Sequence, residues 1–209
     1  EAIQKFVAAN PKMTITSTQW FNYGEKSLAE KYEAILNSGA QAVILITIET
    51  EGALLVREVA QLPANQRLPF IGTASITGGD FPKMTGEALG KVDLVFPQTY
   101  NIHESRSDRA KSVLASAQRL FGIKDPVDIK SPMGFVHAYD LMHILALAIN
   151  KAGSTDRTAV RDALEEVTNY DGLIMRYKQP FTKTRHEALN LQNVIMARYD
   201  ASGVIREIK

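Results

Sequence analysis

Residues 134–172 constrain the fold of this chain more than any other segment. A long apolar stretch is followed by a Gly-Ser-Thr-Asp turn, a second amphipathic segment and a Tyr-Asp-Gly sequence. Residues 141–149 are apolar almost throughout, so the pattern predicts a helix that is buried rather than lying on the surface. Gly153 suits the left-handed residue that ends such a helix, and Asp156 can cap the next one. That second helix has one apolar stripe at positions i, i+3, i+4 and i+7, formed by Val160, Ala163, Leu164 and Val167.

Helix and strand patterns alternate through most of the remaining chain. Helices are predicted near 1–9, 28–38, 51–61 and 105–121, and strands near 13–20, 42–47, 69–72 and 92–96. The run at 42–47 is continuously apolar, which is typical of a strand covered on both faces of a parallel sheet. Three further strands close the chain without helices between them, at 173–177, 194–199 and 204–208, the last two joined by a hairpin turn. Together these patterns predict an α/β fold with parallel sheets.

Composition and motifs exclude several classes of function. The chain has 24 Lys and Arg against 23 Asp and Glu, and a net charge of +1 gives no electrostatic argument for a nucleic-acid partner. No apolar run reaches the roughly 18–20 residues of a membrane span. Cysteine is absent, which excludes disulfides and cysteine-based zinc sites. The sequence at 186–190 begins like a zinc-protease motif but ends in Asn190, and no glycine-rich phosphate loop occurs. We therefore predict neither an enzyme nor a cofactor or metal site.

The segment at 139–172 carries a family pattern. An aromatic-Asp pair at 139–140 opens the long helix, and Lys-Ala-Gly-Ser-Thr-Asp follows at 151–156, Val-Arg-Asp-Ala-Leu at 160–164 and Asp-Gly at 171–172. This arrangement resembles the type I periplasmic solute-binding proteins of the Leu/Ile/Val-binding group, which serve ABC transporters of branched-chain amino acids. The resemblance implies a two-lobed fold in which each lobe is a doubly wound, mostly parallel sheet.

The resemblance also implies how the chain is divided between the lobes. Residues 1–97 and 172–209 map to the second lobe and 98–171 to part of the first, with hinge crossings near 97–101 and 170–173. Only the later portion of the family's sequence is matched, so we expect an N-terminal segment of the same protein as a partner. This segment would supply the first, central strand of the second lobe. Each buried polar group left without a hydrogen bond costs about 1–3 kcal/mol, against a total stability of ~5–15 kcal/mol. We therefore expect residues 1–209 alone not to form a stable monomer.

Candidate ligand-binding residues follow from the positions of the strand ends. In open α/β sheets, ligands bind beyond the carboxyl ends of the strands. Three such ends supply the candidates Thr47, Glu49, Thr50, Thr73, Ala74, Ser75, Gln98 and Tyr100. The structural alternative is that these are polar turns, with Thr50 or Glu51 capping the next helix. In amino-acid-binding members of the family an acidic residue often occupies the position of Ala74. Either Glu49 replaces it as the counter-ion of an ammonium group, or the ligand has no amino group.

The resemblance implies a function without covalent chemistry. The protein would be secreted into the periplasm or another extracytoplasmic space, capture a small polar or carboxylated solute between its lobes, and deliver it to a membrane permease. Two alternatives remain open. One is a sensor input domain of a signalling or regulatory protein with the same fold. The other is a nucleotide-dependent α/β enzyme whose phosphate loop lies outside these residues.

Overall fold

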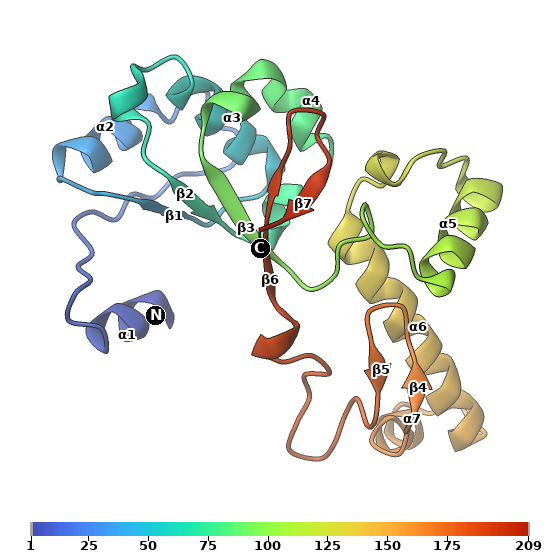
Figure 1. The fold of residues 1–209 in the computed structure, drawn as a ribbon. Coiled ribbons are helices and arrows are strands. Elements are labelled where there is room, and N and C mark those ends of the chain that lie inside the picture. The colour runs from blue at the N-terminus through green and yellow to red at the C-terminus, as the bar shows by residue number, and fades with distance from the viewer. Residues whose placement is uncertain (1, 209) are drawn as a thin grey trace. The chain divides into compact units, whose positions relative to one another are not determined.

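A computed structural model describes residues 2–208 and shows an α/β chain (Figure 1). Its α-helices are α1 Ala2–Ala8, α2 Ala29–Asn37, α3 Glu49–Val59, α4 Phe81–Thr85, α5 Asp108–Phe121, α6 Pro132–Ala152 and α7 Arg157–Leu164. Its strands are β1 Val43–Leu45, β2 Phe70–Gly72, β3 Leu94–Gln98, β4 Tyr170–Asp171, β5 Arg176–Tyr177, β6 Ile195–Tyr199 and β7 Ile205–Glu207. Short 3₁₀ helices are η1 Ala64–Gln66, η2 Ala74–Thr77, η3 Gly86–Lys91, η4 Pro126–Asp128 and η5 Leu191–Asn193.

The chain divides into two compact units. The first contains Glu1–Phe96 and Tyr199–Gly203, and the second contains Pro97–Arg198 and Val204–Lys209. The chain therefore passes from one unit to the other within β3, between Phe96 and Pro97, and returns briefly around the β6–β7 turn. The lobe boundaries and the two hinge crossings inferred from the sequence stay predictions.

The main sheet has five strands in the order β1-β2-β3-β6-β7. β1, β2 and β3 are parallel neighbours, with Val43 opposite Phe70 and Phe70 opposite Leu94. The parallel pairing of the strands near 42–47, 69–72 and 92–96 is thus confirmed. The sheet order also confirms that the distant strand β6 joins this sheet. Parallel neighbours bring the carboxyl ends of β1 and β2 to one edge, which is where the candidate residues of both strands lie.

Aromatic rings and aliphatic side chains form the core of the first unit. α3 presents the fully buried Val56 and Val59 to the sheet, and α2, α3 and α4 lie on the same face of β1–β3 (Figure 1). Phe70 of β2 is buried and stacks on Tyr32 of α2, with ring centroids 5.9 Å apart. Phe96 of β3 is fully buried as well. Burial of side chains of this size stabilises the fold by about 1.5–3 kcal/mol each.

Helix α6 organises the second unit. One part of α6 packs with α5 around the buried residues Ile102, Ala110, Val113, Ile129, Val136 and Leu173. Its other part packs with α7 and the β4–β5 hairpin around Ile144, Ala148, Ala163, Val167 and Tyr177. Gly153 ends α6 in the left-handed conformation, at φ 61°, and the Asp156 side chain caps α7 by accepting from the backbone N–H groups of Thr158 and Ala159. Both helix-boundary predictions are confirmed.

Three sequence-based expectations are wrong. Residues 13–20 form no strand and expose Met13 and Ile15, because their alternation is weak and they pair with no neighbouring strand. Residues 173–177 are not one strand; the chain reverses there, so that β4 and β5 pair as an antiparallel hairpin. Residues 141–149 are not buried all round, since Met142 is 63% exposed. Within residues 141–149, Ile144 and Ala148 are buried in the cluster that α6 forms with α7 and the hairpin.

The prediction that the chain has no apolar stretch long enough to span a membrane does not hold for helix α6. An 18-residue window of this 21-residue helix has a mean hydropathy of 1.3, and the helix is long and apolar enough to cross a membrane, by length and composition alone. Core helices meet the same criterion. Asp140 in the middle of α6 is 1% exposed and binds the β4–β5 hairpin, so this helix serves as a packing element of its unit.

Candidate functional site

Three hydroxyl-bearing residues meet at the carboxyl ends of β1 and β2. The backbone carbonyl oxygen of Thr47 accepts hydrogen bonds from Ser75 Oγ at 2.7 Å and Thr73 Oγ1 at 3.2 Å. The two side-chain oxygens of Thr73 and Ser75 lie 2.8 Å apart. We call Thr47, Thr73 and Ser75 the hydroxyl cluster. Three contacts link these oxygen atoms, but the hydroxyls of Thr73 and Ser75 supply only two protons. At any moment one of the three contacts therefore lacks a donated proton.

The hydroxyl cluster is partly accessible. Thr47 is buried at 7% exposure, Thr73 is half-buried and Ser75 is exposed. Its position is fixed by the sheet, since the Thr73 N–H continues the ladder with a 3.1 Å hydrogen bond to the Leu45 carbonyl. Because the sheet fixes Thr47 and Thr73 while the Ser75 hydroxyl is exposed, the cluster is suited to hydrogen-bonding a polar solute.

Glu49 lies beside the loop that follows β2. It is the first residue of α3, where the helix dipole favours a negative charge. A Cβ atom on Gly79 would lie 2.9 Å from Glu49 Cγ, and one on Gly78 would lie 3.2 Å from Glu49 Oε2. The two glycines therefore leave the space that the carboxylate occupies. The half-buried Ala74 belongs to the same loop, whereas Thr50 is exposed on the first turn of α3 and caps nothing. Ile48 is the N-cap residue, and no side chain caps α3, so the capping alternative for Thr50 and Glu51 is wrong.

The remaining two candidates belong to the second unit. Gln98 ends β3 at 1% exposure, and its Nε2 donates to the Pro97 carbonyl at 3.0 Å. Within the described residues, Gln98 Oε1 is buried without a hydrogen-bond partner. The Tyr100 hydroxyl lies 2.5 Å from Ser105 Oγ, and its half-buried ring packs on the cluster around Ile102. The structure thus brings Thr47, Thr73 and Ser75 into contact and places Glu49 beside the loop that follows β2, but it does not bring Thr50 to them. The approach of Gln98 and Tyr100 to these residues stays a prediction.

Sequence reasoning missed the part played by Asp140. Its carboxylate accepts four hydrogen bonds: Leu173 N–H at 2.6 Å, Ile174 N–H at 2.9 Å, Tyr177 OH at 3.0 Å and Tyr170 OH at 3.3 Å. Burial, and next the charge of Asp140, raises the pKa of both tyrosines, so their hydroxyls remain protonated donors. This carboxylate anchors the hairpin to α6. The Tyr-Asp pair in the sequence was the available signal, but it did not reveal the partners.

A second polar contact joins α6 to the segment that follows β3. His137 Nε2 lies 2.6 Å from Thr99 Oγ1. Burial lowers the pKa of His137, an effect that the charge of Asp140 partly opposes. The imidazole is therefore held mainly in its neutral form at pH 7 and above.

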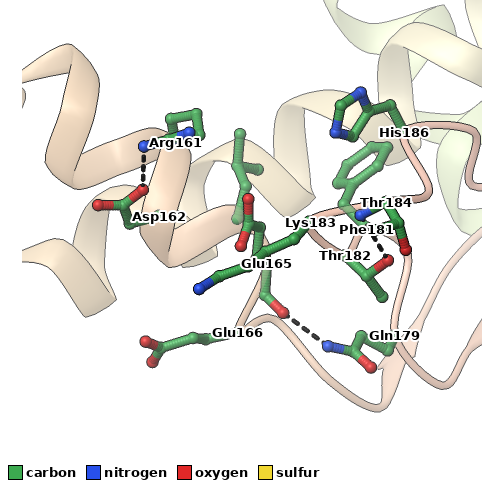
Figure 2. Close-up of a pocket in the computed structure, with 11 residues that line it drawn as sticks. Arg161, Asp162, Glu165, Glu166, Gln179, Phe181, Thr182, Lys183, Thr184 and His186 are labelled. Atoms are coloured by element: carbon green, nitrogen blue, oxygen red, sulfur yellow. Dashed lines mark hydrogen bonds and ion pairs between the residues drawn. The ribbon is translucent and has the colours of Figure 1, made fainter.

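An open pocket in the second unit lies between α7 and residues 179–186 (Figure 2). Gln179 Nε2 donates to the Glu165 carbonyl oxygen at 2.7 Å, and Arg161 is paired with Asp162 at 2.6 Å. Charges of both signs line the pocket, and none is buried. Among residues 2–208, no group of three His, Cys, Asp or Glu side chains is arranged to hold a metal ion. We therefore regard the strand-end residues as the better candidate site.

Comparison with known families decides the classification. The family described as "Periplasmic binding protein" matches residues 1–203, nearly the whole chain. The chain belongs to this family. Its members are solute-binding proteins, and the family resemblance read from residues 139–172 is confirmed.

Solved structures show the same fold. A type 1 periplasmic binding protein from Bordetella pertussis Tohama I matches with a TM-score of 0.79 at 21% identity, over 99% of this chain and 56% of that chain. The leucine-binding protein LivK from Thermotoga maritima matches with a TM-score of 0.77 at 17% identity, over 99% and 54%. LivJ from Streptococcus pneumoniae, solved in complex with isoleucine, matches with a TM-score of 0.68 at 15% identity, over 90% and 50%.

These likenesses establish the type I periplasmic-binding-protein fold as predicted. The chain spans about half the length of the solved structures that it matches. A comparison with curated protein sequences found no match.

Proposed function

We propose that this periplasmic binding protein captures a small polar or carboxylated solute, an amino acid or a related acid, and delivers it to the permease of an ABC transporter. The observation that supports this proposal is the hydroxyl cluster at the carboxyl edge of the β1–β2 sheet. Strand ends of this kind are where open α/β sheets hold ligands. A solute carboxylate is well matched to the hydroxyl donors of Thr73 and Ser75.

The proposed mechanism is hinge closure. Residues 1–97 with 172–209 would form one lobe and 98–171 part of the other, with crossings near 97–101 and 170–173. Tyr100 then contributes a flat apolar face and a hydroxyl beside the solute. Closure buries the solute, and the closed shape is what a permease recognises. The protein would act in the periplasm or an equivalent extracytoplasmic space, without a cofactor.

Calorimetry on the complete protein tests the site. The solute that copurifies is first identified by native mass spectrometry, and it is then titrated into wild type and variants. Removing the Ser75 hydroxyl (Ser75→Ala) or the Tyr100 ring (Tyr100→Ala) should each weaken binding more than about tenfold, equivalent to ~1.4 kcal/mol. Ser154→Ala is the matched control, since Ser154 lies in the exposed turn after α6. Unchanged affinity in both site variants would refute the site.

Because alanine occupies position 74, two classes of solute stay open: solutes with an amino group and solutes without one. A variant of Glu49 distinguishes between them. If Glu49 pairs with a ligand ammonium group, Glu49→Gln should weaken L-leucine binding at least tenfold and leave 4-methylpentanoate, which is leucine without its amino group, unaffected. If the solute has no amino group, wild type should prefer 4-methylpentanoate and Glu49→Gln should change neither affinity. A loss of both ligands would indicate that Glu49 supports the loop instead.

A role as a sensor input domain is the second candidate. One structural neighbour, from Rhodopseudomonas palustris, is described as an extracellular ligand-binding receptor. The complete gene discriminates between the two functions. A fused kinase, cyclase or other signalling domain would favour sensing, whereas a signal peptide and adjacent permease genes would favour transport.

A further inference from the structure

The outer edge of strand β7 is closed by side chains instead of by another strand. β7 is the last strand in the described order of the five-stranded sheet. Directly after it, the Ile208 N–H donates to the Met196 carbonyl oxygen of β6 at 2.8 Å. Because the backbone groups of successive residues in a strand point to opposite sides, those of Ile205 and Glu207 point away from β6. Backbone groups at a sheet edge need partners, since an open edge can pair with another chain.

Three residues of the segment that follows β3 supply these partners. The Ile205 N–H donates to His103 Nδ1 at 3.0 Å, and the Ile205 carbonyl oxygen accepts from Asn101 Nδ2 at 2.9 Å. The Glu207 N–H donates to Glu104 Oε2 at 3.2 Å. Asn101 also binds the other two, because its Nδ2 donates to Glu104 Oε2 at 2.8 Å and its Oδ1 accepts from the His103 N–H at 3.1 Å. We call Asn101, His103 and Glu104 the latch.

The latch joins two places where the chain changes compact unit. One change lies between Phe96 and Pro97, shortly before the latch, and another lies between Gly203 and Val204, directly before β7. Ile102, within the latch segment, is 1% exposed and belongs to the core cluster around α5 and α6. The segment is therefore anchored in this core while its polar side chains bind β7. Both crossing segments are thus attached to the same core.

We propose that the latch residues are positioning residues for solute capture, which keep the two crossing segments together so that they move as one when the solute is enclosed. This inference rests on the proposed function. Segments that are already ordered lose less conformational entropy when a ligand binds. An intact latch therefore strengthens solute binding without touching the solute.

His103 makes the latch sensitive to pH. A backbone N–H can only donate, so the Nδ1 atom that accepts from Ile205 must carry a lone pair. Protonation of the imidazole places a second N–H group against that of Ile205 and breaks the contact. The charged side chains on the two segments are Glu104, Arg206 and Glu207, and Glu104 pairs with Arg206 at 3.0 Å. Glutamate and arginine ordinarily stay charged between about pH 7.5 and 5, so His103 is the latch residue that titrates in this range.

Amide hydrogen exchange of the complete protein without solute tests the latch. The protection factor of the Ile205 amide should fall at least tenfold from pH 7.5 to pH 5, because histidine ordinarily titrates near pH 6.5. His103→Asn keeps an acceptor at the place of Nδ1 but does not titrate, so its Ile205 protection should stay within threefold of the value at pH 7.5. His103→Leu has no acceptor and should lose the protection at both pH values. The Phe70 amide, which donates to the Asp93 carbonyl at 2.8 Å, reports on the sheet as a whole and should not change.

Two exchange results would overturn the proposal. One is an Ile205 protection factor in His103→Leu that equals that of wild type. The other is the same pH dependence in His103→Asn as in wild type, since His137 is present in both proteins and would then explain it.

Calorimetry with the copurifying solute tests the positioning role. His103→Leu should weaken binding at least threefold at pH 7.5, whereas His103→Asn should stay within twofold of wild type. His186→Gln is the control, because His186 is exposed in the loop after β5. Unchanged affinity in His103→Leu, with the Ile205 amide unprotected, would overturn the proposal. A wild type that binds no small solute would refute the proposed function and the positioning role with it, while the exchange pattern of Ile205 would still show that the latch exists.

Discussion

Replacing Asp140 by asparagine should be one of the most destabilising isosteric changes in this chain. Each carboxylate oxygen accepts one backbone N–H and one tyrosine hydroxyl: Oδ1 from Leu173 and Tyr170, Oδ2 from Ile174 and Tyr177. Asparagine keeps one oxygen, but its NH₂ group then faces a backbone N–H that has lost its acceptor. The side chain is 1% exposed, so water offers no ready replacement.

The expected magnitude follows from these contacts. A hydrogen bond to a charged group contributes about 1.5–3 kcal/mol, and a buried donor left unsatisfied costs about 1–3 kcal/mol. The affected tyrosine hydroxyl can rotate and accept from the new amide, which recovers part of the loss. We therefore expect Asp140→Asn to lower the free energy of unfolding by ~2–4 kcal/mol. This loss is a large part of the ~5–15 kcal/mol of a typical domain.

Urea unfolding of the complete protein, followed by circular dichroism, measures this loss. Asp171→Asn is the matched control: Asp171 is 70% exposed and pairs with Arg109 at 3.0 Å. Exposed ion pairs contribute about 0–1 kcal/mol, so the control should stay close to wild type. A change below ~0.5 kcal/mol in Asp140→Asn, or an equal change in both variants, would refute the view that Asp140 anchors the hairpin.

Two further predictions concern the same unit. The folded-state pKa of His137 is lowered by burial from its ordinary value of 6.5, so protonation opposes folding and stability falls as the pH drops below about 6.5. His137→Gln should therefore lose less stability between pH 7.5 and 5 in urea unfolding, and an unchanged pH dependence would contradict this. Gly172→Ala should destabilise by ~1–3 kcal/mol, since its Cβ would lie 2.7 Å from Asp140 Oδ2, whereas Gly90→Ala meets no atom within 4 Å and serves as the control. Equal melting temperatures of the two glycine variants would show that the hairpin accommodates the methyl group.

Local patterns predicted the elements whose determinants are near in sequence. The apolar run at 42–47 became β1 in a parallel sheet, and Gly153 and Asp156 fixed the boundary between α6 and α7. Expectations failed where a distant partner decides the outcome. The alternation at 13–20 was too weak to define a strand without a neighbour. The apolar residues at 173–174 form a turn because Asp140, more than 30 residues earlier, binds their N–H groups.

In the candidate site too, some contacts follow from local sequence patterns and others depend on distant residues. The strand-end rule predicted Thr47, Thr73 and Ser75 to be near one another, and their contacts are set by the parallel pairing of two adjacent strands. Their role in ligand binding stays a prediction. No sequence pattern indicated that Gly78 and Gly79 leave room for the Glu49 side chain. Nor did any pattern indicate that the Tyr100 hydroxyl already has a partner in Ser105. Such contacts depend on side-chain directions that only the folded chain defines.

The proton count of the hydroxyl cluster has a consequence for selectivity. Two protons serve three contacts, so the two hydroxyls of Thr73 and Ser75 together always retain unused lone pairs. If Ser75 turns its proton away from the Thr47 carbonyl, Thr73 still satisfies that oxygen. An arriving group can thus be met either by a donated proton or by a free lone pair, without leaving a buried atom unpaired. In the proposed site we therefore expect these hydroxyls to accept several solute head groups, and we expect discrimination between head groups to come from side chains of fixed polarity, such as the Glu49 carboxylate.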